Sequence, residues 1–217
     1  MRQIEPARRY GVHKIFGPTI QGEGGMTGTV CHFLRLSGCN MWDGRPETRA
    51  ASHCPFCDTD FFSHTMMTAE EIGDELLGLT NWIYRPSWVT ISGGEPALQI
   101  DQDLIDVLHR HFEVAVESNG TRALEAKVDY LTVSPKLPMT QTVVRECDSL
   151  KLLWPHPNPA INPHAYNSIR AGERYLQPIE TGDTEQDDRN IQSAIRELYA
   201  MPNWKLSLQT HKMIGVE

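Results

Sequence analysis

Seven short apolar runs, rich in β-branched and aromatic residues, recur along the chain and have the length of β-strands. Several of them are nearly continuous in hydrophobicity, which is typical of parallel strands that are covered on both faces. The runs predict strands at residues 31–37, 88–92, 114–118, 130–134, 150–154, 175–178 and 204–208.

Amphipathic helical patterns lie between several of these strands. Thr68 and Glu71 have the spacing of a capping box, and apolar residues follow at helical spacing. The same periodicity covers residues 101–111 and 184–200. Alternating strands and helices predict an α/β fold with right-handed crossovers. About six such units would give a partial (βα)6-type barrel in a single domain, residues 1–217, short of the eight units of a complete barrel.

Polar clusters follow the predicted strands. In α/β folds ligands collect at the carboxyl ends of the strands, so these clusters predict one large pocket. The clusters are Gly38-Cys39, Ser92–Pro96, Glu117–Gly120, Ser134–Lys136, Gln177-Pro178 and Gln209–Lys212.

Composition narrows the classes of protein that fit. The chain has 217 residues, of which 40% are hydrophobic and 22% charged, as in ordinary globular proteins. Its net charge of −8 argues against a nucleic-acid binder with a broad basic face. We also expect no membrane partner, because no apolar run approaches the ~20 residues of a membrane span. The odd count of five cysteines, three of them within nineteen residues, favours a reducing cytoplasm over a disulfide framework.

Those three cysteines are set as Cys39-x14-Cys54-x2-Cys57. A closed zinc site needs four ligands, whereas an iron–sulfur cluster held by three thiolates keeps one iron open to another ligand. A structural zinc site completed by His53 or His64 stays open as an alternative. A thioredoxin-like dithiol is less favoured, because it would leave Cys39 without a role.

The cysteine motif followed by Asp58-Thr59, the segment Gly93-Gly-Glu-Pro96 and the segment Glu117–Thr121 together resemble radical S-adenosylmethionine (SAM) enzymes. Residues 10–217 resemble the 7-carboxy-7-deazaguanine synthase family within that superfamily. Superfamily members usually have three residues between the first two cysteines. Here there are fourteen, so an insertion at about 40–53 must loop out and return Cys54 to the cluster.

The resemblance implies a carbon–nitrogen lyase that converts 6-carboxy-5,6,7,8-tetrahydropterin to 7-carboxy-7-deazaguanine with loss of ammonia, a step toward queuosine-type bases. It implies a [4Fe–4S] cluster, SAM and Mg²⁺ as cofactors. In the implied route a 5′-deoxyadenosyl radical takes hydrogen from C6, the ring contracts, and SAM is regenerated, so the radical is supplied by SAM and by no catalytic side chain.

The resemblance also implies a set of cofactor contacts. Cys39, Cys54 and Cys57 would hold the cluster, and Thr59 would help to bind Mg²⁺. Phe56 would pack on adenine, and Glu95 would contact the SAM amine beside backbone left open by glycine. The expected SAM-binding residues are Phe56, Gly93, Gly94, Glu95, Glu117, Ser118, Asn119, Ser134, Lys136 and Gln177.

Arg35 lies inside an apolar strand, where an unpaired charge is costly, so it needs an anionic partner. That partner is a buried carboxylate or a ligand carboxylate, and the resemblance favours the ligand. Glu23 would accept paired hydrogen bonds from the pterin's aminopyrimidine edge. The expected substrate-binding residues are Gln21, Gly22, Glu23, Arg35, Ser92, His211, Lys212 and Glu217.

Two other functions fit parts of the sequence. A glycyl-radical enzyme activase would keep the radical chemistry but act on a protein, and a zinc-stabilised binding module would have no catalytic activity. For the favoured family, the resemblance suggests a homodimer and a flavodoxin-type electron donor.

Overall fold

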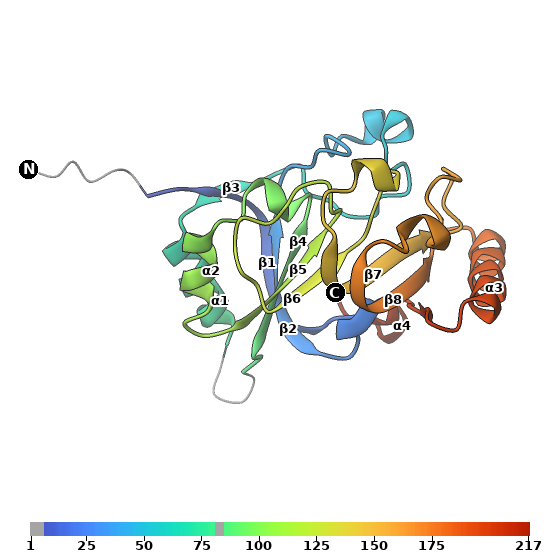
Figure 1. The fold of residues 1–217 in the computed structure, drawn as a ribbon. Helices are drawn as coiled ribbons and strands as arrows, with labels where there is room; N and C mark the ends of the chain where they lie inside the picture. Colours follow the sequence, from blue (N-terminus) through green and yellow to red (C-terminus); the bar gives the residue numbers. More distant parts are fainter. Residues whose placement is uncertain (1–6, 81–84) are drawn as a thin grey trace, which may run out of the picture.

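The computed structural model describes residues 7–80 and 85–217, in which nine strands form one sheet in the order β3-β1-β2-β4-β5-β6-β7-β8-β9 (Figure 1). β1 pairs antiparallel with β2 and β3, and all pairs from β2 to β9 are parallel. The strands are β1 Tyr10–Ile20, β2 Val30–Leu36, β3 Thr65–Met67, β4 Trp88–Gly93, β5 Glu113–Ser118, β6 Tyr130–Val133, β7 Glu146–Trp154, β8 Arg170–Pro178 and β9 Lys205–Leu206.

Four α-helices accompany the sheet in the part of the chain that the structure describes. They are α1 Ala69–Leu79, α2 Gln102–Leu108, α3 Thr184–Ala200 and α4 Thr210–Ile214. The capping box of α1 is present, since the Thr68 hydroxyl accepts from the Glu71 amide and the Glu71 carboxylate accepts from the Thr68 amide. No helix among the described residues is both long and apolar enough to cross a membrane.

Two hydrophobic clusters cover the same face of the sheet, which we call the outer face. One joins β1, β2, β4 and β5 to α1 and α2, and it includes the fully buried Leu34, Ile72 and Leu104. The other joins β6, β7 and β8 to the loops after them and to the end of α3, around Leu150, Leu152 and Tyr166. Because both clusters lie on one face, the opposite face is available for a cavity.

The predicted α/β partial barrel is confirmed: β3 and β9 are the two edges of an open sheet. All seven predicted strands are present, with ends shifted by a few residues, and so are the three predicted helices. The expectation of six regular strand–helix units is corrected, because the three crossovers between β5 and β8 contain no α-helix. Two of these crossovers contain short 3-10 turns, Met139–Gln141 and Pro163–Tyr166.

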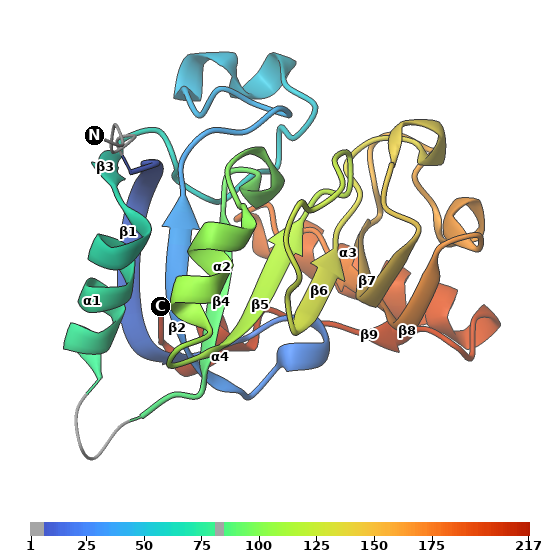
Figure 2. The same ribbon diagram turned by 60° about the vertical axis from the view of Figure 1, so that its left-hand side comes forward.

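The cysteine loop covers the carboxyl ends of the first parallel strands. Figure 2 shows the segment between β2 and β3 above the tips of β2 and β4, on the side toward which the parallel strands point. The Pro-rich stretch 155–162 forms an irregular loop after β7. The cysteine loop therefore lies at the same end of the sheet as the carboxyl ends of the parallel strands.

Candidate active site

One cavity of about 310 Å³ opens at the carboxyl ends of the parallel strands, a volume within the range of small-ligand sites. Every residue predicted for the site lines it. These are Gln21, Gly22, Glu23, Arg35, Cys39, Cys54, Phe56, Cys57, Thr59, Ser92, Gly93, Gly94, Glu95, Glu117, Ser118, Asn119, Ser134, Lys136, Gln177, His211, Lys212 and Glu217.

The three thiols Cys39, Cys54 and Cys57 share one wall of the cavity. Burial raises the pKa of each, that of Cys54 to about 11; a neighbouring thiol adds to the rise at Cys39 and Cys54, and the Asp58 carboxylate adds to it at Cys57. The Lys136 ammonium opposes this effect at Cys54 and Cys57. A bound metal would favour the thiolates strongly, because a coordinated thiol loses its proton.

The donor set fits a cluster better than a single ion. No three His, Cys, Asp or Glu side chains of residues 7–80 and 85–217 converge closely enough to hold one metal ion. A polynuclear cluster distributes its thiolates over separate irons, so it needs no such convergence. The Met41 amide donates to Cys39 Sγ at 3.4 Å, the kind of bond that tunes cluster sulfurs. His53 and His64, the zinc alternatives, do not line the cavity.

Gly93 and Gly94 are required by close packing of the chain itself. An added Cβ would lie 2.2 Å from the Leu36 carbonyl oxygen at Gly93 and 2.0 Å from the Gly38 carbonyl oxygen at Gly94. The Gly94 and Glu95 amides donate to these same oxygens at 2.8 and 2.9 Å. The glycines therefore let β4 fix the segment that leads into Cys39, which the ligand-based reading of the motif did not predict.

Glu95 is buried and already has three protein donors. Its carboxylate accepts from the Ala97 amide at 3.0 Å, the Ser118 hydroxyl at 2.7 Å and the Asn119 amide at 2.7 Å. Burial raises the pKa of Glu95, against the effect of these hydrogen bonds. Glu95 thus orients the Ser118–Asn119 turn toward the cavity, and its expected contact with a ligand amine stays a prediction.

The insertion at 40–53 folds back as part of the cavity wall. Trp42 is buried, and its Nε1 donates to the Thr48 hydroxyl at 3.0 Å, while Met41 and Trp42 line the cavity. Asn40 donates to Thr121 Oγ1 at 2.8 Å and accepts from Asn119 Nδ2 at 2.9 Å. These bonds connect the cysteine loop to the turn after β5.

Arg35 is half-buried on the cavity side of β2. Its guanidinium lies 5.1 Å from the centroid of the Phe16 ring, which stacks on Phe33. It makes no ion pair with a carboxylate of the described residues. No carboxylate of the described residues therefore fills the partner role expected from the sequence, and the expected contact with a ligand carboxylate stays a prediction.

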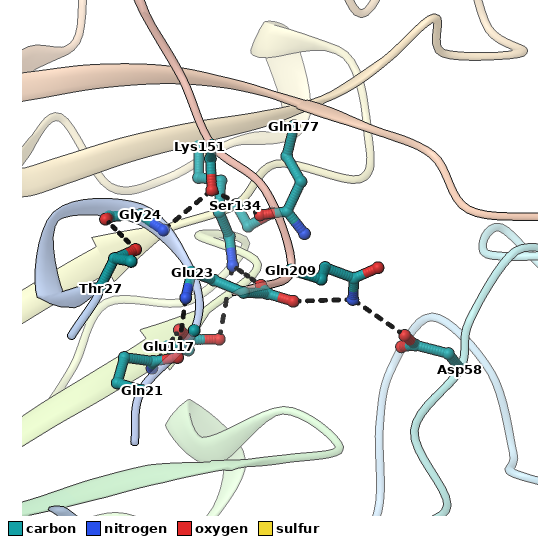
Figure 3. Close-up of polar contacts among 12 residues, drawn as sticks. Gln21, Glu23, Gly24, Thr27, Asp58, Glu117, Ser134, Lys151, Gln177 and Gln209 are labelled. Atoms are coloured by element: carbon teal, nitrogen blue, oxygen red, sulfur yellow. Dashed lines mark hydrogen bonds and ion pairs between the residues drawn. The ribbon is translucent and has the colours of Figure 1, made fainter. Parts of the chain in front are cut away.

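Glu23 and Glu117 lie on either side of a buried lysine that we did not predict (Figure 3). Lys151 is 3% exposed and pairs with Glu23, and its Nζ is 3.7 Å from Glu117 Oε2. Gln209 Nε2 donates to Glu23 at 2.8 Å, and Gln21 Nε2 donates to Glu117 at 3.1 Å. Glu117, expected among the SAM contacts, thus lies with the expected substrate residues.

The charges in this network shift the pKa values of its members. Burial alone would raise the pKa of Glu23, but the Lys151 charge and hydrogen bonds from Lys151 and Gln209 lower it to about 2. Burial would lower the pKa of Lys151, and the charges of Glu117 and Glu23 reverse that effect and raise it. Both partners are therefore charged at neutral pH.

The C-terminal residues close one side of the cavity. The Lys212 ammonium is held by Asp58 at 2.9 Å and by Glu180, so it already has two carboxylate partners. Thr19 Oγ1 donates to the Glu217 backbone oxygen at 2.6 Å. Glu217 therefore lies at the cavity, and its expected contact with the substrate stays a prediction.

The remaining predicted residues lie at the cavity in separate settings. The Phe56 ring packs edge-to-face on His156, with centroids 5.3 Å apart. Lys136 Nζ donates to the Ser134 carbonyl oxygen at 3.0 Å, and buried Gln177 accepts from Ser207 Oγ at 2.9 Å. Thr59, Ser92 and His211 line the cavity, and their expected ligand contacts stay predictions.

Sequence reasoning assigned no binding role to Asp58, Lys151 or Gln209. Lys151 carried the same signal as Arg35, a charge inside an apolar strand, and that signal could have identified it. Asp58 directly follows a cluster cysteine, and Gln209 opens the polar group after the last strand. Neither position alone separates a site residue from an ordinary turn residue.

Comparison with known proteins gives consistent results. The 7-carboxy-7-deazaguanine synthase of Nitratidesulfovibrio vulgaris is 42% identical over 219 residues, covering 95% of this chain and 99% of the relative. That of Caulobacter vibrioides is 40% identical over 218 residues, with the same coverage. A crystal structure of QueE from Escherichia coli superposes with a TM-score of 0.66 at 24% identity, covering 93% and 94% of the two chains, and supports the fold. No protein-family model matches the chain.

Proposed function

The chain belongs to the 7-carboxy-7-deazaguanine synthase family, and from this premise we propose that it is a radical SAM lyase. Its substrate is 6-carboxy-5,6,7,8-tetrahydropterin, and its products are 7-carboxy-7-deazaguanine and ammonia. The two products account for all atoms of the substrate, so the conversion needs no net oxidant or reductant. The reaction serves the biosynthesis of queuosine-type 7-deazapurines.

The residues that would bind the cofactors are the three cysteines on one wall of the cavity and the polar residues at the neighbouring strand ends. Cys39, Cys54 and Cys57 would hold a [4Fe–4S] cluster, and Thr59 would contribute an oxygen ligand to Mg²⁺. When bound, the cluster and SAM supply the 5′-deoxyadenosyl radical that starts the reaction. The protein orients SAM through the Gly93–Glu95 segment, the Ser118–Asn119 turn and the polar residues Ser134, Lys136 and Gln177.

Substrate binding falls to the opposite side of the cavity. Glu23 and Glu117 would accept hydrogen bonds from the N–H donors of the aminopyrimidinone ring, and Gln21 would hold Glu117 in place. Arg35 would pair with the substrate carboxylate, because a planar guanidinium matches a carboxylate in two parallel bonds. The substrate would then lie between its carboxylate contact and the SAM side, with C6 facing the radical source.

One observation supports this proposal above the others: a single cavity brings three thiols together with an arginine that has no carboxylate partner among the described residues. A glycyl-radical activase explains the thiols but not a half-buried arginine that needs a small anion. A zinc module would need His53 or His64 as the fourth ligand, and neither histidine lines the cavity that holds the three thiols. It also gives Arg35 no anionic partner. Neither alternative has support from the relatives' names.

The decisive experiment is anaerobic reconstitution followed by assay with the pterin, SAM, a reductant and Mg²⁺. We expect an iron–sulfur absorbance band and formation of 7-carboxy-7-deazaguanine, and we expect both to disappear in a Cys54→Ala/Cys57→Ala variant. Turnover by that variant would contradict the cluster assignment. A homodimer, a flavodoxin-type reductant and a cytoplasmic location belong to the same proposal.

Arg35→Ala separates substrate binding from cofactor chemistry. Loss of a hydrogen bond to a charged group costs about 1.5–3 kcal/mol, so kcat/KM for the pterin should fall roughly tenfold to a hundredfold or more. Reductive cleavage of SAM without substrate should continue, because Arg35 lies on the substrate side. Normal pterin conversion by Arg35→Ala would show that the carboxylate binds elsewhere.

A further inference from the structure

Lys151 is a buried cation on the wall of the substrate cavity. Along β7, Leu150 and Leu152 are fully buried in the outer core, and the alternation of a strand directs Lys151 and Leu153 to the cavity side. The Lys151 side chain is only 4% exposed. Lysine is almost never buried to this degree without a partner, so its partners define what it does.

Those partners come from two separate parts of the fold. Glu23 lies in the loop between β1 and β2, and Glu117 lies near the end of β5. Gln21 joins the two acids, because its Nε2 donates to Glu117 and its Oε1 accepts from the Glu23 amide, both at 3.1 Å. Two carboxylates, one ammonium and an amide thus form one unit in the cavity wall (Figure 3).

We propose that Lys151 is a positioning residue for substrate recognition, whose charge holds Glu23 and Glu117 together on one side of the cavity so that both accept hydrogen bonds from the pterin's N–H edge. This inference rests on the proposed function and deepens it. Lys151 balances the charges of the two substrate-binding acids, and it belongs to neither the proposed cluster ligands nor the proposed SAM contacts.

Charge balance is the physical reason for the assignment. Without the ammonium, two partly buried carboxylates would repel each other, and repulsion favours a proton on one member of such a pair. The other charged groups near the pair are Lys136 and Asp58, which line the same cavity. A protonated carboxyl presents an O–H donor to a ligand edge that also consists of donors. The mismatch would leave buried polar groups without partners, which sharply weakens binding.

Glu23 keeps room for a ligand even with its protein partners in place. One of its oxygens accepts from Gln209 at 2.8 Å and the other from Lys151. An ionised carboxylate has about four lone-pair sites, so about two remain for paired donors on a pterin. Lys151 and Gln209 therefore hold the Glu23 carboxylate in place and leave lone pairs available to a ligand.

The test measures binding of 6-carboxypterin to the anaerobically reconstituted holoenzyme with SAM, by equilibrium dialysis from mildly acidic to neutral pH. We expect Lys151→Met to weaken binding roughly tenfold to a hundredfold at neutral pH. Its affinity should also rise with pH, as the uncompensated acid pair loses its proton. The natural protein should show little pH dependence over the same range.

Lys205→Met is the matched control. Lys205 is 58% exposed and pairs with Glu173 outside the cavity, so its removal deletes the same charge without touching the recognition site. Its affinity and pH profile should equal those of the natural protein. A second probe is 6-carboxylumazine, which has a carbonyl in place of the 2-amino group: the natural protein should prefer the pterin, and Lys151→Met should narrow that preference.

If Lys151→Met does not fold, the comparison moves to Glu117→Gln and Lys151→Met/Glu117→Gln, which removes the uncompensated second charge. Loss of the lysine should again lower the affinity and introduce a pH dependence, because burial alone raises the pKa of the remaining carboxylate, Glu23. Unchanged affinity and pH profile on removal of Lys151 in the background that folds would overturn the inference. Failure of the natural protein to bind 6-carboxypterin would instead overturn the proposed function.

Discussion

Arg35 and Lys151 show how two charges inside apolar strands, one half-buried and one buried, can have opposite roles. Arg35 has an aromatic neighbour but no carboxylate partner among the residues described, so it is available to an anionic ligand. Lys151 has two carboxylate partners from the protein, so it is available to none. A charge inside an apolar strand needs a partner, which the sequence analysis recognised only for Arg35, and only the fold shows whether the partner is internal.

Gly94 is the residue whose replacement should most directly disturb the cysteine wall. A methyl group at this position would lie 2.0 Å from the Gly38 carbonyl oxygen, one residue before Cys39. Overpacking of this kind costs about 1–3 kcal/mol, so Gly94→Ala should lower the free energy of unfolding by at least that amount. Urea unfolding of the anaerobic protein without cluster would measure it.

Gly78→Ala provides the control for this substitution. Gly78 lies in α1, and an added Cβ would have no neighbour within 4 Å. Alanine is a better helix former than glycine, so this variant should be unchanged or more stable by about 0.5–1 kcal/mol. Equal stability of the two variants would mean that the β4 tip can shift away from Gly38 at no cost.

The elements predicted correctly have strong periodicity, and those missed have irregular backbone. α1 and α3 carry capping residues and amphipathic repeats over several turns, which suffices to place them. β1 was not predicted, because Gly17 and Pro18 and two shifts in its register with β2 interrupt the alternation of a strand. The crossovers after β6 and β7 contain prolines, which explains their short 3-10 turns.

The insertion at 40–53 should depend on Asn40 for its closed position. Asn40→Ala removes two hydrogen bonds to the turn after β5, worth about 1–2 kcal/mol together. The loop should then open more often, and cleavage after exposed Arg49 by trypsin should accelerate roughly tenfold, since proteolysis follows the open population. Mass spectrometry of the early fragments would measure the rate at that bond.

Asn158→Ala is the comparison variant, because Asn158 lies in the Pro-rich loop after β7 and bonds locally to Ala160. It should leave cleavage after Arg49 unchanged. If Asn40→Ala is as resistant as Asn158→Ala, the packing of Trp42 alone holds the insertion. The role of Asn40 in joining the cysteine loop to the Ser118–Asn119 turn would then be dismissed.

At the scale of the whole molecule, the location of the site follows from topology and its internal bonding does not. Parallel strands place their carboxyl ends at one edge, so polar clusters after six predicted strands had to meet there. Which side chains pair within that edge depends on strand register and loop paths, which no local pattern encodes. The Glu23–Lys151–Glu117 unit joins residues 128 positions apart in the chain, and only the folded sheet brings them together.

The same unit should appear in the pH dependence of global stability. The pKa of Glu23 is lowered from 4.5 to about 2 in the folded protein, so its stabilisation is present above pH 4.5 and is lost as pH falls through the folded value. A shift of this size corresponds to about 3 kcal/mol. The difference in unfolding free energy between the natural protein and Glu23→Gln should therefore be constant near neutral pH and narrow progressively below pH 4.5.

Urea unfolding at a series of pH values would measure this difference, with Glu146→Gln as control. Glu146 pairs with Arg170, but the two side chains are 68% and 80% exposed, so solvent screens their interaction and its removal should change little at any pH. A difference in unfolding free energy between the natural protein and Glu23→Gln that stays constant below pH 4.5 would mean that Lys151 does not hold Glu23 ionised. Because the same ionised state is what a donor-rich ligand edge requires, the stability measurement also tests, without any ligand, the charge state on which substrate recognition depends.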